Sequence, residues 1–178
     1  MELEQLKYPI GKFVKPSTID QSTIQSWIEE IEHLPHQIRK AVEDLSEEQL
    51  NTPYRPEGWT IRQVIHHLPD SHMNSYVRFR WALTEDSPTI KAYHEDRWAE
   101  LDDAKHADIN ISLILLEAIH IRWCMLLRSL TPEQLKKHFI HPESGAKVYL
   151  DENIGSYAWH GKHHLAHIKN CIEENNFD

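Results

Sequence analysis

The sequence predicts an all-α protein, a four-helix bundle with a small β-hairpin before the last helix. Two observations lead to this prediction. Four long stretches carry apolar residues at the three- and four-residue spacing of helices, and no convincing set of strands competes with them. The chain has 178 residues, which is long enough for one sizeable hydrophobic core and too short to favour two. We therefore expect one domain over residues 1–178.

The first two predicted helices can be placed from their ends and from a proline. The first covers about 18–44, and Pro35 inside it lacks the N–H that a helix interior uses. A kink or a split into two helices is therefore expected there. The second covers about 60–83. Thr60 is its predicted N-cap, and Gln63 completes a capping box with it.

The third and fourth helices are separated by the predicted hairpin. The third starts at the N-cap Asp108 and ends near residue 130, and its many Ile and Leu residues suggest that it is the most buried of the four. The fourth covers about 153–174. Between 139 and 150, two short apolar runs flank the turn sequence Pro-Glu-Ser-Gly, which predicts a β-hairpin. The linker 85–107 contains Tyr93, Trp98 and Leu101, and its length and these residues suggest that it packs over the bundle.

Two short segments of the chain resemble each other. Leu-Ser-Glu-Glu-Gln-Leu at 45–50 follows the first helix, and Leu-Thr-Pro-Glu-Gln-Leu at 130–135 follows the third. Each contains a Ser or Thr capping box, and Pro132 occupies the favourable first position of the second turn. We therefore interpret the chain as two related helix–turn–helix halves, whose second and fourth helices both carry histidines.

Composition excludes several classes of function. The formal net charge is −9 with histidines neutral, and no Lys/Arg-rich block interrupts it, so nucleic acids and anionic membranes are poor candidate partners. No apolar run approaches the roughly 20 residues that span a bilayer, and the first residues are acidic where a signal peptide is basic. Cys124 and Cys171 lie in helical patterns and make no disulfide framework. We expect a cytoplasmic protein.

Histidines near the C-terminus are the strongest chemical signal. On the fourth helix His160 and His164 lie one turn apart on the same face, so their imidazoles can converge on one point. Divalent metals bind such neutral nitrogen ligands. The second helix offers His66 and His67 as a third ligand. On a helical wheel His67 borders the apolar face and His66 points outward, which favours His67.

Several polar residues on the same two helices are candidates for orienting a ligand or binding a substrate. They are Asp70, Ser71, Asn74, Arg78 and His163. Arg78 would suit a carboxylate on the substrate. Asp70 or His163 could hold a metal ligand in place through a hydrogen bond, although His163 is expected to point outward.

The spacing of the histidines also allows a simpler interpretation. A chain with 14 histidines places some of them one turn apart by chance, so a surface role for His160 and His164 stays open at this point. The remaining histidines, His72 and His120 among them, are interpreted as surface residues or satisfied polar residues. The sequence contains no HExxH motif, Cys-x-x-Cys pair, Gly-rich phosphate loop or serine nucleophile elbow. No catalytic residue is therefore assigned.

Two segments resemble the DinB/YfiT-like superfamily. They are Gly-Trp-Thr-Ile-Arg-Gln-Val-Ile-His-His-Leu-Pro-Asp at 58–70 and Tyr-Ala-Trp-His-Gly-Lys-His-His-Leu-Ala-His-Ile at 157–168. The family motif is a histidine before Leu-x-Asp on the second helix and H-x-x-x-H on the fourth. By position, the resemblance selects His67, His160 and His164 as ligands of one divalent metal ion per chain. It extends over essentially the whole chain.

The resemblance implies a metal-dependent hydrolase or a transferase of low-molecular-weight thiols such as bacillithiol. In both cases a three-histidine site, with zinc or nickel as the expected metal, would activate water or a thiol against a small-molecule substrate. A stress-linked metal-binding or scaffold protein without enzymatic activity is the alternative, and its structural metal would need a fourth ligand.

The resemblance also implies assembly into a homodimer. The third helix is apolar around much of its circumference, and paired bundles would cover that surface. The linker aromatics Tyr93 and Trp98 are the alternative cover for it. Neither Cys124 nor Cys171 is expected to take part in the mechanism, because both follow the core periodicity of their helices.

Overall fold

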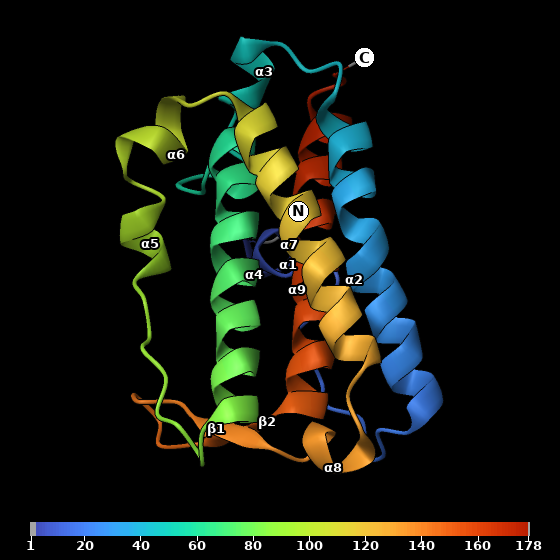
Figure 1. The fold of residues 1–178 in the computed structure, drawn as a ribbon. Coiled ribbons are helices and arrows are strands. Elements are labelled where there is room, and N and C mark those ends of the chain that lie inside the picture. Colours follow the sequence, from blue (N-terminus) through green and yellow to red (C-terminus); the bar gives the residue numbers. More distant parts are fainter. Residues whose placement is uncertain (1–2, 178) are drawn as a thin grey trace.

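The computed structural model describes residues 3–177, and they form a bundle of four long helices (Figure 1). Residues 1–2 and 178, at the two ends of the expected domain, lie outside the described residues. The elements in chain order are α1 (Leu3–Lys7), α2 (Gln21–Val42), α3 (Glu47–Leu50), α4 (Ile61–Thr84), α5 (Glu95–Trp98), α6 (Asp102–His106), α7 (Ile109–Arg128), α8 (Pro132–Leu135), β1 (His138–Ile140), β2 (Lys147–Tyr149) and α9 (Leu150–Glu174). The predicted fold class is confirmed.

The four long helices pack as a ring in which α7 and α9 each contact both α2 and α4. In Figure 1, α2 and α9 run in one direction, whereas α4 and α7 run in the other. Because α4 and α7 are parallel, the chain must return along the bundle between them. The linker does this beside α4, where α5 and α6 pack. Ile90 and Ala99 of this linker are buried, which confirms that it covers the bundle.

The predicted caps form as expected. Thr60 accepts a hydrogen bond from the backbone N–H of Gln63, and the Gln63 side chain accepts one from the backbone N–H of Thr60. The two similar short turns, α3 and α8, each begin with a complete capping box. Asp108 caps α7 by accepting from the backbone N–H of Asn110. Local sequence therefore defines where these helices begin.

Pro35 lies inside α2 without splitting it. The helix is continuous from Gln21 to Val42 and is capped by Asp20, so of the two expected outcomes, a kink or a split, the split does not occur, and the helix is shorter than 18–44. A proline removes one intrahelical hydrogen bond, but the residues around it compensate through burial. Leu34, Pro35 and Ile38 are all buried against the rest of the bundle.

The expectation that α7 is the most buried helix is also wrong. α7 contacts α2 and α4, and its opposite side faces outward. Large apolar residues are exposed along that side, namely Ile111, Ile114, Leu115, Ile121 and Met125. Within the described residues, α7 is the one helix long and apolar enough to cross a membrane by length and composition alone. Its inner side forms part of the bundle core.

The hairpin before the last helix forms as predicted. β1 and β2 are antiparallel, with Phe139 opposite Val148. Phe139 is buried, so the hairpin closes one end of the core. α9 begins at Leu150, directly after β2 and three residues before the predicted start near 153. The early start follows from packing, because the side chain of Leu150 is fully buried in the same core.

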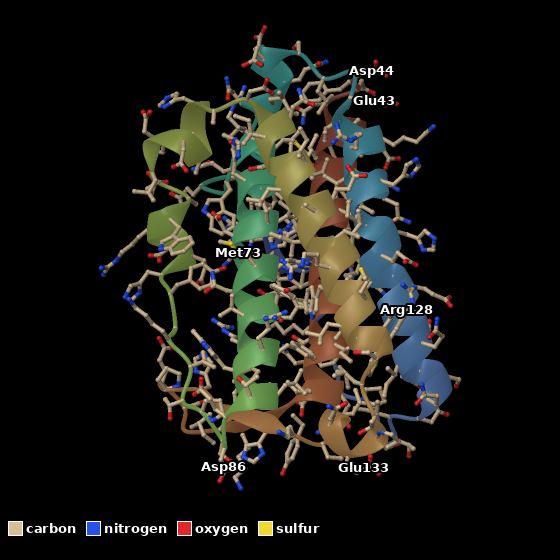
Figure 2. All side chains as sticks on the ribbon, in the orientation of Figure 1. Glu43, Asp44, Met73, Asp86, Arg128 and Glu133 are labelled. Atoms are coloured by element: carbon tan, nitrogen blue, oxygen red, sulfur yellow. The ribbon has the colours of Figure 1, made fainter. Side chains whose placement is uncertain are left out.

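The core consists of two apolar clusters, one at each end of the bundle. One surrounds Trp123 and Phe79 near the hairpin, and the other surrounds Ile38 and Leu68 toward the α3 end. Between them lies a layer of buried histidines from α4, α7 and α9. Figure 2 shows nitrogen atoms gathered at this level in the middle of the bundle. The fold therefore holds polar groups at a depth where apolar residues are the rule.

Candidate metal centre

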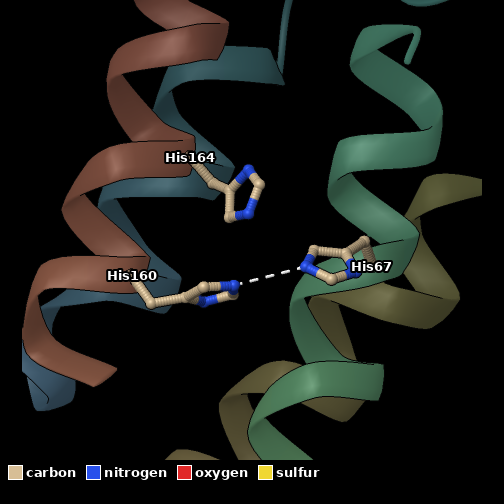
Figure 3. A group of neighbouring side chains, drawn as sticks. All are labelled: His67, His160 and His164. Carbon is tan, nitrogen blue, oxygen red and sulfur yellow. Dashed lines mark hydrogen bonds between the residues drawn. The ribbon is translucent and has the colours of Figure 1, made fainter. Parts of the chain in front are cut away.

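Three histidines from two helices meet at the buried layer, where His67 and His164 are buried and His160 is half-buried. His67 comes from α4, and His160 and His164 come from α9 (Figure 3). One nitrogen from each lies within 4.8 Å of one nitrogen from each of the others. The Nε2 atoms of His67 and His160 are 3.3 Å apart. The structure thus brings together the three side chains that the sequence singled out.

The helix geometry explains this convergence. His160 and His164 are one turn apart on α9, and their ring centroids are 4.5 Å apart. Gly161 between them lets α2 approach closely, because a Cβ at this position would lie 2.5 Å from a methyl carbon of Leu34. His67 reaches the pair from α4, which packs against α9.

Burial sets the charge of these histidines. Desolvation lowers the pKa of His67 from 6.5 to about 4, with a smaller effect from His163. Desolvation also lowers the pKa of His160 and of His164 well below 6.5, and neighbouring histidines add to both shifts. All three rings are therefore neutral at pH 7. A group of neutral, convergent imidazoles is the donor set that zinc, nickel and related divalent ions accept, so the residues fit a metal.

His167 belongs to a second histidine group that shares a member with the first. His163, His164 and His167 also place their nitrogens within 4.8 Å of one another. However, both ring nitrogens of His167 already have neighbours. Its Nε2 lies 3.2 Å from the carbonyl oxygen of Lys7, and its Nδ1 lies 3.4 Å from Nδ1 of His164. This arrangement favours His167 as a support for His164 and the first group as the ligands.

His66 is buried, which corrects the expectation that it points outward. Its Nε2 donates to the carbonyl oxygen of Ala107 at 3.2 Å, and its Nδ1 accepts from the hydroxyl of Ser112 at 2.7 Å. The linker and the start of α7 cover this side of α4, and the helical wheel alone does not show that cover. Since both nitrogens are satisfied, His66 is a structural residue.

His163 is likewise buried and not directed outward. Its ring stacks on Trp159 at 4.6 Å and lies 5.9 Å from the ring of Tyr8. The N-terminal segment that carries Tyr8 covers this part of α9. Burial lowers the pKa of His163 to about 4, and within residues 3–177 its Nδ1 has no hydrogen-bond partner.

The other polar candidates differ in their position relative to the cavity over the histidines. Ser71 lines the cavity over the histidines and contacts the Tyr157 hydroxyl. Asp70, Asn74 and Arg78 are not among the residues that line it. Asn74 donates to the backbone carbonyl of Asp70 instead of to a ligand. Burial, followed by repulsion from Asp103, raises the pKa of Asp70 to about 6.

Of two histidines that sequence reasoning set aside, His72 contacts the site and His120 contacts His72. His72 is fully buried, and its Nε2 lies 3.1 Å from Nδ1 of His160. On its other side, His72 Nδ1 lies 2.8 Å from Nε2 of His120 on α7. His72 follows His67 by five residues on α4, a spacing that does not place the two on one face, so periodicity gave no signal for it.

A cavity of about 670 Å³ opens over the three histidines. Aromatic, basic and acidic side chains line it, including Tyr54, Trp59, Tyr93, Lys7, Arg55, Glu57, Glu95 and Asp96. Its volume is that of a small-molecule site. Neither cysteine lines it, and burial raises the pKa of Cys124 to about 11 and that of Cys171 above 9.0. Both thiols are therefore protonated at pH 7.

Residues 30–168, which include the three histidines, match the model of the DinB superfamily. The chain belongs to the DinB superfamily. A DinB relative from Bacillus mycoides (strain KBAB4), named "Putative metal-dependent hydrolase", is 52% identical over 175 residues, which cover 98% of this chain and 100% of the relative. A protein of the same descriptive name from Bacillus cereus (strain G9842) is 54% identical over 166 residues, which cover 93% of this chain and 95% of the relative.

The DinB fold is shared with a solved structure. YfiT from Bacillus subtilis is described as "a probable metal-dependent hydrolase with an unusual four-helix bundle topology". It matches this chain with a TM-score of 0.96 and 45% sequence identity, over 98% of this chain and 99% of YfiT. The resemblance expected from the sequence is thus confirmed, and the chain stands among DinB proteins named as metal-dependent hydrolases.

Proposed function

We propose that this protein is a metal-dependent enzyme in which His67, His160 and His164 bind one divalent ion and a small nucleophile is activated beside it. The observation that carries the proposal is the convergence of three neutral imidazoles beneath an open cavity. Within residues 3–177, this ligand group contains no fourth side chain. A site with three protein ligands leaves a position for water or substrate, whereas structural zinc sites are filled by four.

Some residues of the site would bind the ion, and others would exclude solvent or bind the substrate. A divalent ion held by three imidazoles supplies a Lewis acid that lowers the pKa of a coordinating water or thiol. Trp59 covers the site, with its ring centroid 4.7 Å from that of His67. Lys7 and Arg55 place positive charge in a cavity that also contains acidic residues, so a small polar molecule fits it better than an extended apolar one.

Water and a low-molecular-weight thiol such as bacillithiol are the competing nucleophiles in this proposal. Water would make the protein a hydrolase, in keeping with the names of its relatives. A thiol would make it an S-transferase. Zinc and nickel both suit nitrogen ligands, so we propose one of these as the metal. The same site would serve either reaction.

The deciding assay offers the metal-loaded protein an electrophile, such as a halonitrobenzene or an epoxide, with and without a low-molecular-weight thiol. A parallel assay offers esters and amides without any thiol. Turnover that disappears with a chelator and returns with zinc or nickel supports the enzyme, and its thiol dependence decides between transferase and hydrolase. Inactivity in both assays, with metal bound, would favour the metal-binding or scaffold protein.

A further inference from the structure

The backbone carbonyl of Ile31 is freed by a proline. In an α-helix this oxygen would accept a hydrogen bond from the N–H four residues later, but that residue is Pro35, which has none. The carbonyl of Ile31 accepts instead from Nδ1 of His120, at 2.5 Å. His120 reaches it from α7, which packs against α2. The interior proline thus creates a buried acceptor that faces the histidine layer.

This acceptor determines the direction of a hydrogen-bond chain. A carbonyl oxygen only accepts, so Nδ1 of His120 must carry the proton. A neutral imidazole has one N–H, so Nε2 of His120 accepts from Nδ1 of His72 at 2.8 Å. By the same reasoning, Nε2 of His72 accepts from Nδ1 of His160 at 3.1 Å. The proton of His160 is therefore on Nδ1, and its Nε2 presents a lone pair.

We propose that His72 and His120 are positioning residues, which fix the tautomer and ring orientation of His160 through a chain anchored on the Ile31 carbonyl. The lone pair on Nε2 of His160 then faces His67 and His164, as ligation requires. The role of this chain in ligand binding rests on the proposed metal site. The chain itself is a property of the metal-free protein.

The surroundings of His72 and His120 support this role. Their relative exposures are 0% and 2%, so water does not compete for the ring nitrogens. Among the described residues, the polar partners of these two rings are imidazoles and a carbonyl, and no carboxylate joins the chain. Trp123 packs edge-on against both rings, with centroids 5.9 Å from His72 and 6.1 Å from His120. The rings are therefore held in orientation by packing and by hydrogen bonds together.

The other ligand of α9 is supported in a similar way. Nε2 of His167 donates to the carbonyl oxygen of Lys7, so Nδ1 of His167 is an acceptor. Nδ1 of His167 faces Nδ1 of His164. The proton of His164 is therefore on Nδ1, and the lone pair of His164 is on Nε2. Both ligands of this helix thus connect to a backbone carbonyl outside α9. A backbone carbonyl keeps its acceptor character at every pH, which makes it a fixed anchor.

The tautomers can be measured directly in the metal-free protein. Long-range proton–nitrogen correlation spectra of the ¹⁵N-labelled protein at neutral pH distinguish Nδ1–H from Nε2–H rings. We expect Nδ1–H for His120, His72 and His160. Nε2–H on His160 would overturn the proposal. This readout needs neither metal nor activity, so it stands apart from the test of the proposed function.

Substitutions separate positioning from simple packing. Zinc affinity should fall about 10–100-fold in His72→Leu, because the chain is broken. In His72→Gln the amide can still donate to one neighbour and accept from the other, so affinity should recover at least partly. Equal affinity of the His72→Leu variant and the wild type would refute the role. A His72→Gln variant that folds normally but binds no better than His72→Leu would also refute it.

Pro35 and Pro69 provide a matched pair of variants. Pro35→Ala restores an N–H that competes with His120 for the Ile31 carbonyl. Pro69→Ala restores a backbone N–H on α4, and the helical acceptor of that N–H is outside the chain of histidines. We expect a loss of zinc affinity and a mixture of His160 tautomers in Pro35→Ala alone. Identical spectra and affinities for the two variants would count against the Ile31 anchor.

Discussion

The Nε2 atoms of His67 and His160 lie 3.3 Å apart across the contact between α4 and α9. One of the two must donate to the other in the metal-free protein, because two lone pairs repel at this distance. The direction of the hydrogen-bond chain assigns the donor role to His67. A divalent ion would replace this hydrogen bond with two bonds to nitrogen, so metal binding and the α4–α9 contact are linked.

The metal content should depend on the α9 pair. A His160→Ala/His164→Ala double variant is expected to lose the bound ion, because one imidazole from α4 cannot hold it alone. Metal analysis after exhaustive dialysis provides the measurement. His66→Ala is the comparison variant, and it should retain the metal, because Ser112 and the Ala107 carbonyl use both nitrogens of His66. Undiminished metal in the double variant would contradict the ligand assignment.

The bundle should survive removal of its metal. Two apolar clusters lie on either side of the histidine layer, around Trp123 and around Ile38, and neither requires an ion to be buried. Far-UV circular dichroism before and after chelation should show the same helical signal, with a lower melting temperature in the chelated sample. Collapse of the helical signal would indicate a structural metal and favour the scaffold alternative.

Acid should destabilise the metal-free protein below about pH 6.5. Burial lowers the pKa of His120 and of His67 from 6.5 to about 4, so between these values the unfolded chain binds protons that the folded chain does not. The stability contributed by each neutral histidine is complete above pH 6.5 and is lost as the pH falls toward 4, at up to about 1.4 kcal/mol per pH unit. Urea unfolding across this range measures it.

A His120→Gln variant is the control for that pH series. Its amide can still donate to the Ile31 carbonyl, but it removes one titrating group, so the free energy of unfolding should depend less steeply on pH. The same slope in the variant and the wild type would show that protonation of His120 is not what destabilises the protein in acid.

We propose that the protein forms a homodimer through the outer side of α7. Ile114 and Ile121 are 62% and 57% exposed on that side, and a second copy of the same helix would remove them from water. Tyr93 and Trp98, which were the alternative cover for this surface, pack on each other in the linker, with ring centroids 4.8 Å apart. Sedimentation at micromolar concentration should give twice the 21.0 kDa of one chain.

An Ile114→Glu/Ile121→Glu variant should then sediment as a single chain, because burial of two carboxylates opposes association. Gln25→Glu, on the exposed side of α2, is the charge control and should leave the assembly unchanged. A 21.0 kDa species for the wild type would refute the dimer.

Local sequence determined the helices, their caps and the pairing of His160 with His164. Thr60 and Gln63 form their capping box from residues three apart, and the α9 pair is one helical turn apart, so neither depends on the rest of the chain. The family motif, which is also a short stretch of sequence, selected His67. These features were predictable because their physics lies within a few residues.

The tertiary structure alone decided which other histidines are buried and what Pro35 does. His66 and His163 are covered by the linker and by the N-terminal segment, which are distant in sequence. From the sequence, Pro35 indicates only that one backbone N–H is missing. The carbonyl of Ile31 that this leaves free accepts from His120, because the packing of α7 places His120 beside it. Helical periodicity reports the direction of a side chain from its own axis. The partner in that direction depends on how the four helices pack, and that information is not local.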